Sequence, residues 1–479
     1  MKQSLTVLFI ITFLNISHSL KSEDSQAQEL EAVYPVTDLL LKKGLTYKIL
    51  FSERTDSVIN FKGLKSPSKG RHDFLAFIVN DGDTIVYVGH EDRERDNIKG
   101  DGGGGTVFNV TYDGNEWYTT SKYNSIDFSS VGGTINNCGG SLTPFNTILT
   151  AEEWDKSSNI EVSNNGNWIS DTSNYANREK WENFGWMVEV DPISGKALRK
   201  LYEMGRYAHE DAELVLEMKT VYLTDDNSPS VWFKFVYNEW NNLSDGKLFA
   251  FKGDGEWIEL PNDRDSLNKI RDVAIARGAV MFNRFEWIER IGNKLYITET
   301  GKDIDKWKKH IKRGGIPAKH LESKLDNKNN IIDPFGRVLE FDLDNESMNV
   351  LLEGGTSEAK GFTFSNPDGL ASTKFNGKDY LLIHEDIIGT SLGRSGSSVS
   401  NEDEVYNEIY LLEIGKDRYI IDDLMRVAVA PRGCETTGGY FSPDGKHLFL
   451  NIQEPDPKNP EPFNRSHTVV VSGFELLFD

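Results

Sequence analysis

Short apolar runs that end in acidic residues recur along most of the chain. Six of them carry an acidic pair or its near equivalent, at 86–92, 147–153, 221–226, 295–300, 381–386 and 448–454. Apolar runs of this length between Gly, Asp and Asn turns are typical of β-strands. Their spacing of about 60 to 90 residues suits one four-stranded propeller blade with its loops. The pattern predicts an all-β fold, a six-bladed β-propeller with loop and short helical insertions.

Other segments complete this picture. The apolar alternation at 185–195 and 336–344 closes on Asp/Gly turns, which is typical of outer blade strands. The last strand, expected at 468–477, can pair with a strand at 45–51 and close the ring, which removes exposed sheet edges. A basic insertion at 303–324 is the clearest helical candidate, and we expect it to be a solvated surface segment.

The acidic strand ends have two explanations. If all six end the same kind of strand, the symmetry of the ring brings them to one mouth of the central channel. Carboxylates gathered there repel one another unless cations compensate them. Alternatively, they are ordinary turn residues, which explains Asp better than Glu.

Charge and the N-terminus indicate an exported protein. The net charge of −22 argues against nucleic acid as a partner. Acid excess either keeps an exported protein soluble or supplies oxygen ligands to hard cations. The apolar run at 5–14, after Lys2 and before small residues, predicts a signal peptide at 1–19. We expect a flexible segment at 20–31, one propeller domain at 32–479, a periplasmic or extracellular location, no membrane span and a monomer.

Cys138 and Cys434 are the two cysteines of the chain. The stretch 136–154 brings Cys138 to Glu152 and Glu153 across a Gly/Pro-marked turn. A thiolate next to two carboxylates predicts a metal ion that holds the negative charges together. In an oxidising compartment, the alternative is a disulfide between the two cysteines.

Five ordered segments resemble the PhoX-type alkaline phosphatases. They are an Asn-Cys, Thr-Pro and Glu-Glu signature at 132–153, an aromatic-Ala-His-Glu segment at 205–211, Arg-Phe-Glu at 284–286, and a closing pair at 431–438 and 440–455. The resemblance spans roughly 86–456. Members of this family are exported calcium- and iron-dependent phosphatases built on a propeller.

The resemblance implies a phosphomonoesterase that hydrolyses small phosphate esters at a multinuclear iron and calcium centre in the propeller mouth. Thiolate for iron and hard oxygen ligands for calcium agree with ligand softness. A planar guanidinium fork suits phosphate oxygens. The implied residues are Cys138, Glu210 and Glu286 for iron; Asn137, Glu153, Glu435 and Glu91 for calcium; and Arg284, Arg432 and Arg206 for phosphate.

The sequence departs from the family pattern in places. Phe285 replaces a proline, Glu454 stands where histidine is usual, Ala151 stands where a further cysteine is common, and the signal lacks twin arginines. These departures put the metal complement and the activity in question more than the fold.

Several residues keep two interpretations. His209 and His384 are either metal ligands or hydrogen-bonded strand-end residues, and we expect the second. The pair Asp225 and Asp226 forms either a calcium contact or a turn, and Asp368 has the same two options.

Two other functions fit the same acids. One is a calcium-stabilised propeller that binds a partner without catalysis. The other is a propeller lactonase or phosphotriesterase, which needs calcium and carboxylates but no thiolate. Iron together with calcium favours the phosphatase.

Overall fold

The computed structural model describes residues 30, 35–80, 82–93, 98–154, 179–387 and 406–478. The predicted signal peptide and most of the predicted flexible segment lie outside these residues. Leu30 is an exception within that segment, because it is buried beside Val36, Tyr406 and Val429. Its carbonyl also accepts a hydrogen bond from Arg426. At Leu30, therefore, the structure shows a packed residue and not a flexible one.

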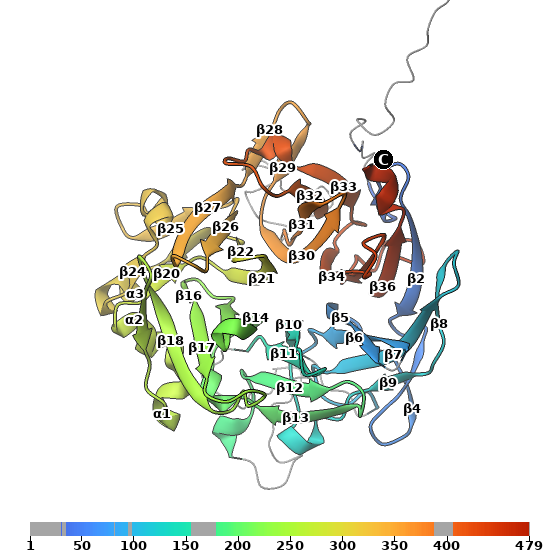
Figure 1. Ribbon diagram of the computed structural model, residues 1–479, viewed down its shortest axis with the longest axis horizontal. Coiled ribbons are helices and arrows are strands. Elements are labelled where there is room, and N and C mark those ends of the chain that lie inside the picture. Colours follow the sequence, from blue (N-terminus) through green and yellow to red (C-terminus); the bar gives the residue numbers. More distant parts are fainter. Residues whose placement is uncertain are drawn as a thin grey trace, which may run out of the picture.

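Six sheets surround a central axis as the blades of a propeller (Figure 1). The innermost strands of neighbouring blades contact one another around the whole ring. The six-bladed all-β prediction is confirmed. In the order of blades 1 to 6, the innermost strands are β5 (His72–Asn80), β10 (Asn137–Leu142), β14 (His209–Val215), β21 (Phe285–Ile291), β30 (Pro367–Phe375) and β34 (Glu435–Phe441).

The apolar runs with acidic ends form the second strand of every blade. Each pairs antiparallel with the innermost strand of its own blade. The C-terminal end of the second strand therefore lies at the same face of the ring in all six blades. The second strands are β6 (Asp83–His90), β11 (Ile148–Glu152), β15 (Thr220–Asp225), β22 (Lys294–Glu299), β31 (Lys378–Glu385) and β35 (His447–Gln453).

The ring closes through its two ends. In blade 6 the C-terminal strand β36 (His467–Ser472) pairs with the N-terminal strand β2 (Thr46–Ser52), with Thr46 opposite Ser472. The predicted closure is thus confirmed. The alternating segments at 185–195 and 336–344 contain β12 (Met187–Asp191) and β26 (Arg337–Asp342). Both are third strands, because β13 (Lys196–Lys200) and β27 (Ser347–Glu353) lie outside them.

Blade 4 carries an insertion between β22 and β26. The insertion contains β23 (Lys302–Lys306), α3 (Lys308–Arg313), β24 (Ile316–Pro317), the 3-10 helix η6 (Lys319–Lys324) and β25 (Asn330–Asp333). The helix predicted over 303–324 is therefore only partly correct. Gly314 ends α3 in the left-handed region, at φ +117°, where a Cβ is disfavoured.

Helices elsewhere are few. The sequence interpretation missed α1 (Arg264–Leu267) and α2 (Ile270–Ala276), which follow the outermost strand β19 (Glu256–Glu259) of blade 3. Among the described residues, no helix has both the length and the apolar character needed to span a bilayer.

Aromatic and aliphatic side chains fill the space between blades. The Trp232 ring of blade 3, for example, packs edge-on against Phe341 of blade 4, with ring centroids 4.7 Å apart. Both side chains are fully buried. Such aromatic pairs add to the stability that burial provides. The packing fixes the blades relative to one another, and with them the residues at the channel mouth.

Candidate metal and phosphate site

In blades 1 to 5, a bulge at the start of the innermost strand places one carboxyl or thiol group at or beside the channel mouth. In blades 1 to 5 the pairing register shifts directly after the first residue pair. An extra residue at a bulge re-aims its side chain. The shifts contain Asp73, Cys138, Glu210, Glu286 and Asp368, whereas Glu435 is the first residue of the strand in blade 6.

The two acids at the second-strand ends have different roles. In blades 2, 3 and 5 the first acid of the pair is buried and binds backbone or cations within its own blade. Glu152 accepts from Lys200 Nζ at 2.9 Å and from the Trp186 amide at 3.2 Å. Glu385 accepts from the Ser365 amide at 2.9 Å. Asp225 likewise accepts from the Val231 amide.

The next residue in the chain is the one that faces the mouth. Glu91, Glu153, Asp226 and Asp386 all line its cavity. Convergence is therefore confirmed for four blades, and it fails for two. Blade 4 has Thr300 at this place, and Glu454 of blade 6 lies in a neighbouring cleft.

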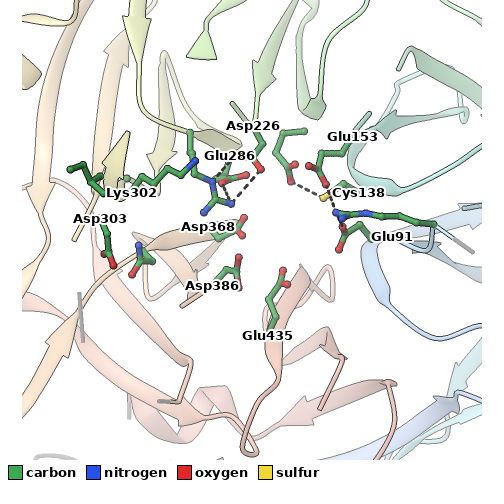
Figure 2. A pocket seen from close by; sticks show the side chains of 16 residues that line it. Glu91, Cys138, Glu153, Asp226, Glu286, Lys302, Asp303, Asp368, Asp386 and Glu435 are labelled. Atoms are coloured by element: carbon green, nitrogen blue, oxygen red, sulfur yellow. Dashed lines mark hydrogen bonds and ion pairs between the residues drawn. The ribbon is translucent and has the colours of Figure 1, made fainter. Parts of the chain in front are cut away.

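The cavity at the mouth encloses about 500 Å³. Figure 2 shows carboxylates from several blades pointing into it around Cys138. Nine carboxylates and three cations line this cavity among the described residues. The acids are Glu91, Glu153, Glu210, Asp226, Glu286, Asp303, Asp368, Asp386 and Glu435, and the cations are Arg93, Arg284 and Lys302.

Cys138 lies among carboxylates. Its Sγ is 2.9 Å from Glu210 Oε1 and 3.2 Å from Asp73 Oδ2. Burial, followed by the charges of Asp73 and Glu210, raises the pKa of the thiol well above its ordinary value. A metal ion bound at Sγ reverses this effect, because coordination stabilises the thiolate.

Two sets of ligand atoms meet at Glu210. Those of Cys138, Glu153 and Glu210 all lie within 4.8 Å of one another, and so do those of Glu210, Glu286 and Asp368. Glu210 thus belongs to both sets. A carboxylate in this position can bridge two metal ions.

The carboxyls repel one another strongly. Burial and then the neighbouring charge of Glu286 raise the pKa of Glu210 well above its ordinary value. Burial and the charge of Asp386 do the same for Glu435. Asp226 differs, because Arg284 outweighs the effect of burial and lowers the pKa of this carboxyl.

Arg284 is held in the cavity wall by two acids. Its Nε is 2.7 Å from Asp226 Oδ1, and one Nη nitrogen is 2.8 Å from Glu286 Oε1. The residue has φ +65° and directly precedes β21. This backbone turn and the two acids fix the guanidinium group at the mouth.

Three predicted site residues have other contacts. Asn137 Oδ1 accepts from the Gly104 amide at 2.6 Å and from Thr134 Oγ1 at 2.8 Å. Arg206 Nε donates to the Phe184 carbonyl, and Arg432 Nε is 3.2 Å from Asp456 Oδ2. None of the three is among the described residues of the cavity wall. In this structure the Asn137 amide oxygen is therefore engaged by the fold, and neither arginine is among the described wall residues, so their predicted roles stay predictions.

The same geometry bears on the two histidines and on the cysteines. His209 Nε2 bonds the Gly205 carbonyl and His384 Nδ1 bonds Thr436, so both are hydrogen-bonded, although neither bonds the adjacent glutamate. Both cysteines are unpaired, and Cys434 packs in the apolar cluster between blades 5 and 6. The disulfide alternative is therefore wrong.

The sequence interpretation missed several residues of the site. Asp73 occupies the same bulge in blade 1 as Cys138 in blade 2, and this shared register was the available signal. Arg93 follows the mouth acid Glu91 by two residues, and its Nη2 is 3.1 Å from Glu91 Oε1. Lys302 and Asp303 come from the insertion of blade 4, whose path no local pattern revealed.

Comparison with known proteins agrees with this geometry. The sequence model described as alkaline phosphatase PhoX matches residues 113–456, which is most of the chain. The chain belongs to the PhoX alkaline phosphatase family. A structure of Pseudomonas fluorescens PhoX in complex with vanadate, a transition state analogue, shares the PhoX fold with a TM-score of 0.68 at 19% identity. The match covers 92% of this chain and 97% of that chain.

More distant structures are also similar. A Trichoderma reesei carbohydrate-active enzyme of family AA12 has a TM-score of 0.42 at 9% identity, covering 92% of this chain and 99% of that chain. Trypanosoma rangeli sialidase has a TM-score of 0.41 at 10% identity, and the match covers 91% of this chain and 60% of that chain. Neither supports a functional argument for this PhoX protein. A search of curated protein sequences finds no match.

Membership in the PhoX family makes the protein a phosphatase. It decides against the non-catalytic binding module and against the lactonase. The family is metal-dependent, and the acidic groups described above are suited to metal ions.

Proposed function

We propose that the protein is an exported phosphomonoesterase whose channel mouth binds iron and calcium around Cys138. The observation that carries the proposal is the pair of ligand sets that share Glu210, one of them containing a thiol. Export is supported by the signal-like N-terminal sequence and by the export that is typical of the family.

The donor set fits metal ions. Nine acids and three cations around one cavity leave an excess of negative charge, and several of the acids are buried. Removing such charges from water is unfavourable unless cations compensate them. Bound metal ions supply this compensation, and they also polarise phosphate and activate water.

Ligand softness divides the site between two metals. A thiolate selects transition metals, so Cys138 and Glu210 of the first ligand set, together with Glu286 of the second, are assigned to iron. Calcium prefers oxygen ligands, which Glu153, Glu435 and Glu91 provide. Asp226, Asp368 and Asp386 face the same cavity and extend the oxygen set.

Arg284 orients the phosphate. Its described contacts use Nε and one Nη nitrogen, which leaves the other Nη for a phosphate oxygen. Asp226 and Glu286 hold the guanidinium plane, so little side-chain freedom remains to be lost on binding. The group would therefore stabilise negative charge on the phosphate where it increases during the reaction.

The departures from the family pattern leave the proposed ligand side chains in place, including Phe285, which is fully buried between Arg284 and Glu286. Ala151 is fully buried in the core of blade 2, and Glu454 pairs with Arg71 at 2.6 Å outside the cavity. Neither position removes one of the described ligand atoms. We therefore expect the protein to be an active phosphatase.

Loss of the thiol tests the assignment. The purified protein should contain iron and calcium, hydrolyse p-nitrophenyl phosphate, and absorb visible light through charge transfer between thiolate and iron. Cys138→Ala should lose colour, iron and activity together. Elemental analysis, absorption spectra and initial rates give the three readouts.

Cys434→Ala is the matched control. This cysteine is also buried, 2% exposed against 8% for Cys138, but it packs among apolar residues. The variant should fold and keep its colour, iron and activity. A colourless wild-type protein, or a Cys138→Ala variant with normal iron content and rates, would overturn the assignment of iron to Cys138.

A further inference from the structure

A second cavity opens next to the metal site, between blades 6 and 1. It encloses about 540 Å³ and is called the basic cleft here. Its wall comes from the loops after β2, before β5, after β6 and after β35. The described residues with charged side chains in this wall are Arg54, Arg71, Arg93, Lys99, Arg465, Glu53, Asp92 and Glu454.

The charge of this cleft is opposite to that of the chain. Five basic and three acidic residues line it, although the protein has a net charge of −22. The neighbouring cavity has nine acids and three cations. An acidic protein that concentrates cations in a hollow attracts anions to that place.

The arginines of the cleft are accessible. The Arg54 side chain is 69% exposed and lies 2.7 Å from Glu53, and Arg71 is 33% exposed beside a half-exposed Glu454. Glu53 is only 11% exposed, but the Arg71 pair is exposed on both sides, and such pairs contribute little to stability. Their guanidinium groups can therefore exchange part of this pairing for a ligand at small cost.

Arg93 joins the two cavities. It lines the basic cleft and the metal site, and its Nε donates to Asn136 Oδ1 at 2.7 Å. The two hollows therefore share the Arg93 side chain as a wall residue. A substrate bound in one hollow therefore has the other hollow as its immediate neighbour.

We propose that the basic cleft binds a second anionic group of the substrate, so that the enzyme favours phosphate monoesters that carry a further phosphate. This inference rests on the proposed phosphatase site. The ester phosphate lies at the metals beside Arg284, and the second phosphate lies against Arg54 and Arg71. Charge-assisted bonds between guanidinium and phosphate provide the selectivity.

Two substrates that differ by one phosphate test this. The value of kcat/KM for glucose 1,6-bisphosphate should exceed that for glucose 6-phosphate by about tenfold or more, the factor given by one charge-assisted hydrogen bond. High salt should reduce the ratio. In the double variant R54Q/R71Q the ratio should fall to about one, with the rate on glucose 6-phosphate unchanged.

The control removes two exposed cations elsewhere. Lys247 and Lys252 lie on β18 (Gly246–Gly253) of blade 3, paired with Glu259 and Glu256, so K247Q/K252Q changes the net charge equally. It should keep the full ratio. Equal rates of the wild-type protein on both sugars, or an unchanged ratio in R54Q/R71Q, would overturn the inference.

A binding measurement separates this inference from the proposed function. Glucose 1,6-bisphosphate should raise the Tm of the wild-type protein more than glucose 6-phosphate does, and R54Q/R71Q should abolish the difference. If the protein hydrolyses neither sugar, the proposed function fails, while the Tm difference still decides the cleft. Equal Tm shifts with both sugars would count against it.

Discussion

At the scale of single residues, the site depends on neighbours in sequence that face different environments. Glu152 is bound to Lys200 and to backbone inside blade 2, whereas Glu153 reaches the cavity. In the same way, Asp225 accepts from the Val231 amide inside blade 3, whereas Asp226 pairs with Arg284 at the cavity. Because successive side chains of a strand point to opposite sides, one acid stabilises the blade and the next serves the cavity.

Arg284→Lys tests the role of the guanidinium fork. Lysine keeps the charge but cannot bind Asp226, Glu286 and a phosphate oxygen in one plane. We expect kcat/KM for p-nitrophenyl phosphate to fall by about two orders of magnitude, as after loss of one preorganised donor, with little change in Tm.

Arg290→Lys is the control for this variant. Arg290 lies on the same strand and pairs with Glu217 away from the cavity wall. Its replacement should leave the rate unchanged. Wild-type kinetics in Arg284→Lys would show that this side chain does not contact phosphate.

At the scale of elements, the strands that recur in every blade could be predicted from the sequence. The six second strands were recognisable because an apolar run and an acidic end recur in each blade. The bulges that aim Cys138 and Glu210 were not, since a register shift depends on the pairing partner. Asn137 was assigned to calcium from its motif, whereas the Gly104 amide, far away in sequence, occupies its oxygen.

The insertion of blade 4 is anchored by one buried arginine. Arg337 binds Glu299 at the end of β22 and Asp333 at the end of β25, both fully buried. Burial raises the pKa of Glu299, but His320 and Arg337 outweigh it and lower the pKa to about 2. This contribution to stability is present above the unfolded pKa and is lost as the pH falls toward 2.

Arg337→Met should destabilise the protein by roughly 3 to 5 kcal/mol at neutral pH, because two buried carboxylates lose their partner. Without Arg337 the buried carboxyls take up a proton more readily in the folded state. The loss of unfolding free energy should therefore be smaller at pH 5 than at pH 7.5. Urea unfolding at both pH values measures this.

Arg277→Met is the reference for this change, since Arg277 lies exposed at the end of α2. Its unfolding free energy should match the wild-type value at both pH values. A loss in Arg337→Met that is no larger than in Arg277→Met would contradict the anchoring role.

At the scale of the whole molecule, a closed ring forces charges from different blades together. β2 and β36 lock the ring, and the packing between blades prevents the mouth from widening. The carboxylates of the cavity therefore cannot separate to relieve their repulsion. Metal ions bound at the mouth then stabilise the complete propeller as well as its chemistry.

Removal of metal should accordingly lower stability and activity together. At a metal concentration of about 100 times Kd, binding to the folded state contributes on the order of 3 kcal/mol. Dialysis against excess chelator should lower the Tm and abolish hydrolysis of p-nitrophenyl phosphate, and added calcium should restore the part of the Tm that depends on the oxygen ligands. Chelator already saturated with calcium should have no effect on the Tm. An unchanged Tm after complete metal removal would mean that the converging acids tolerate one another without cations, and the charge argument for the metal site would fail.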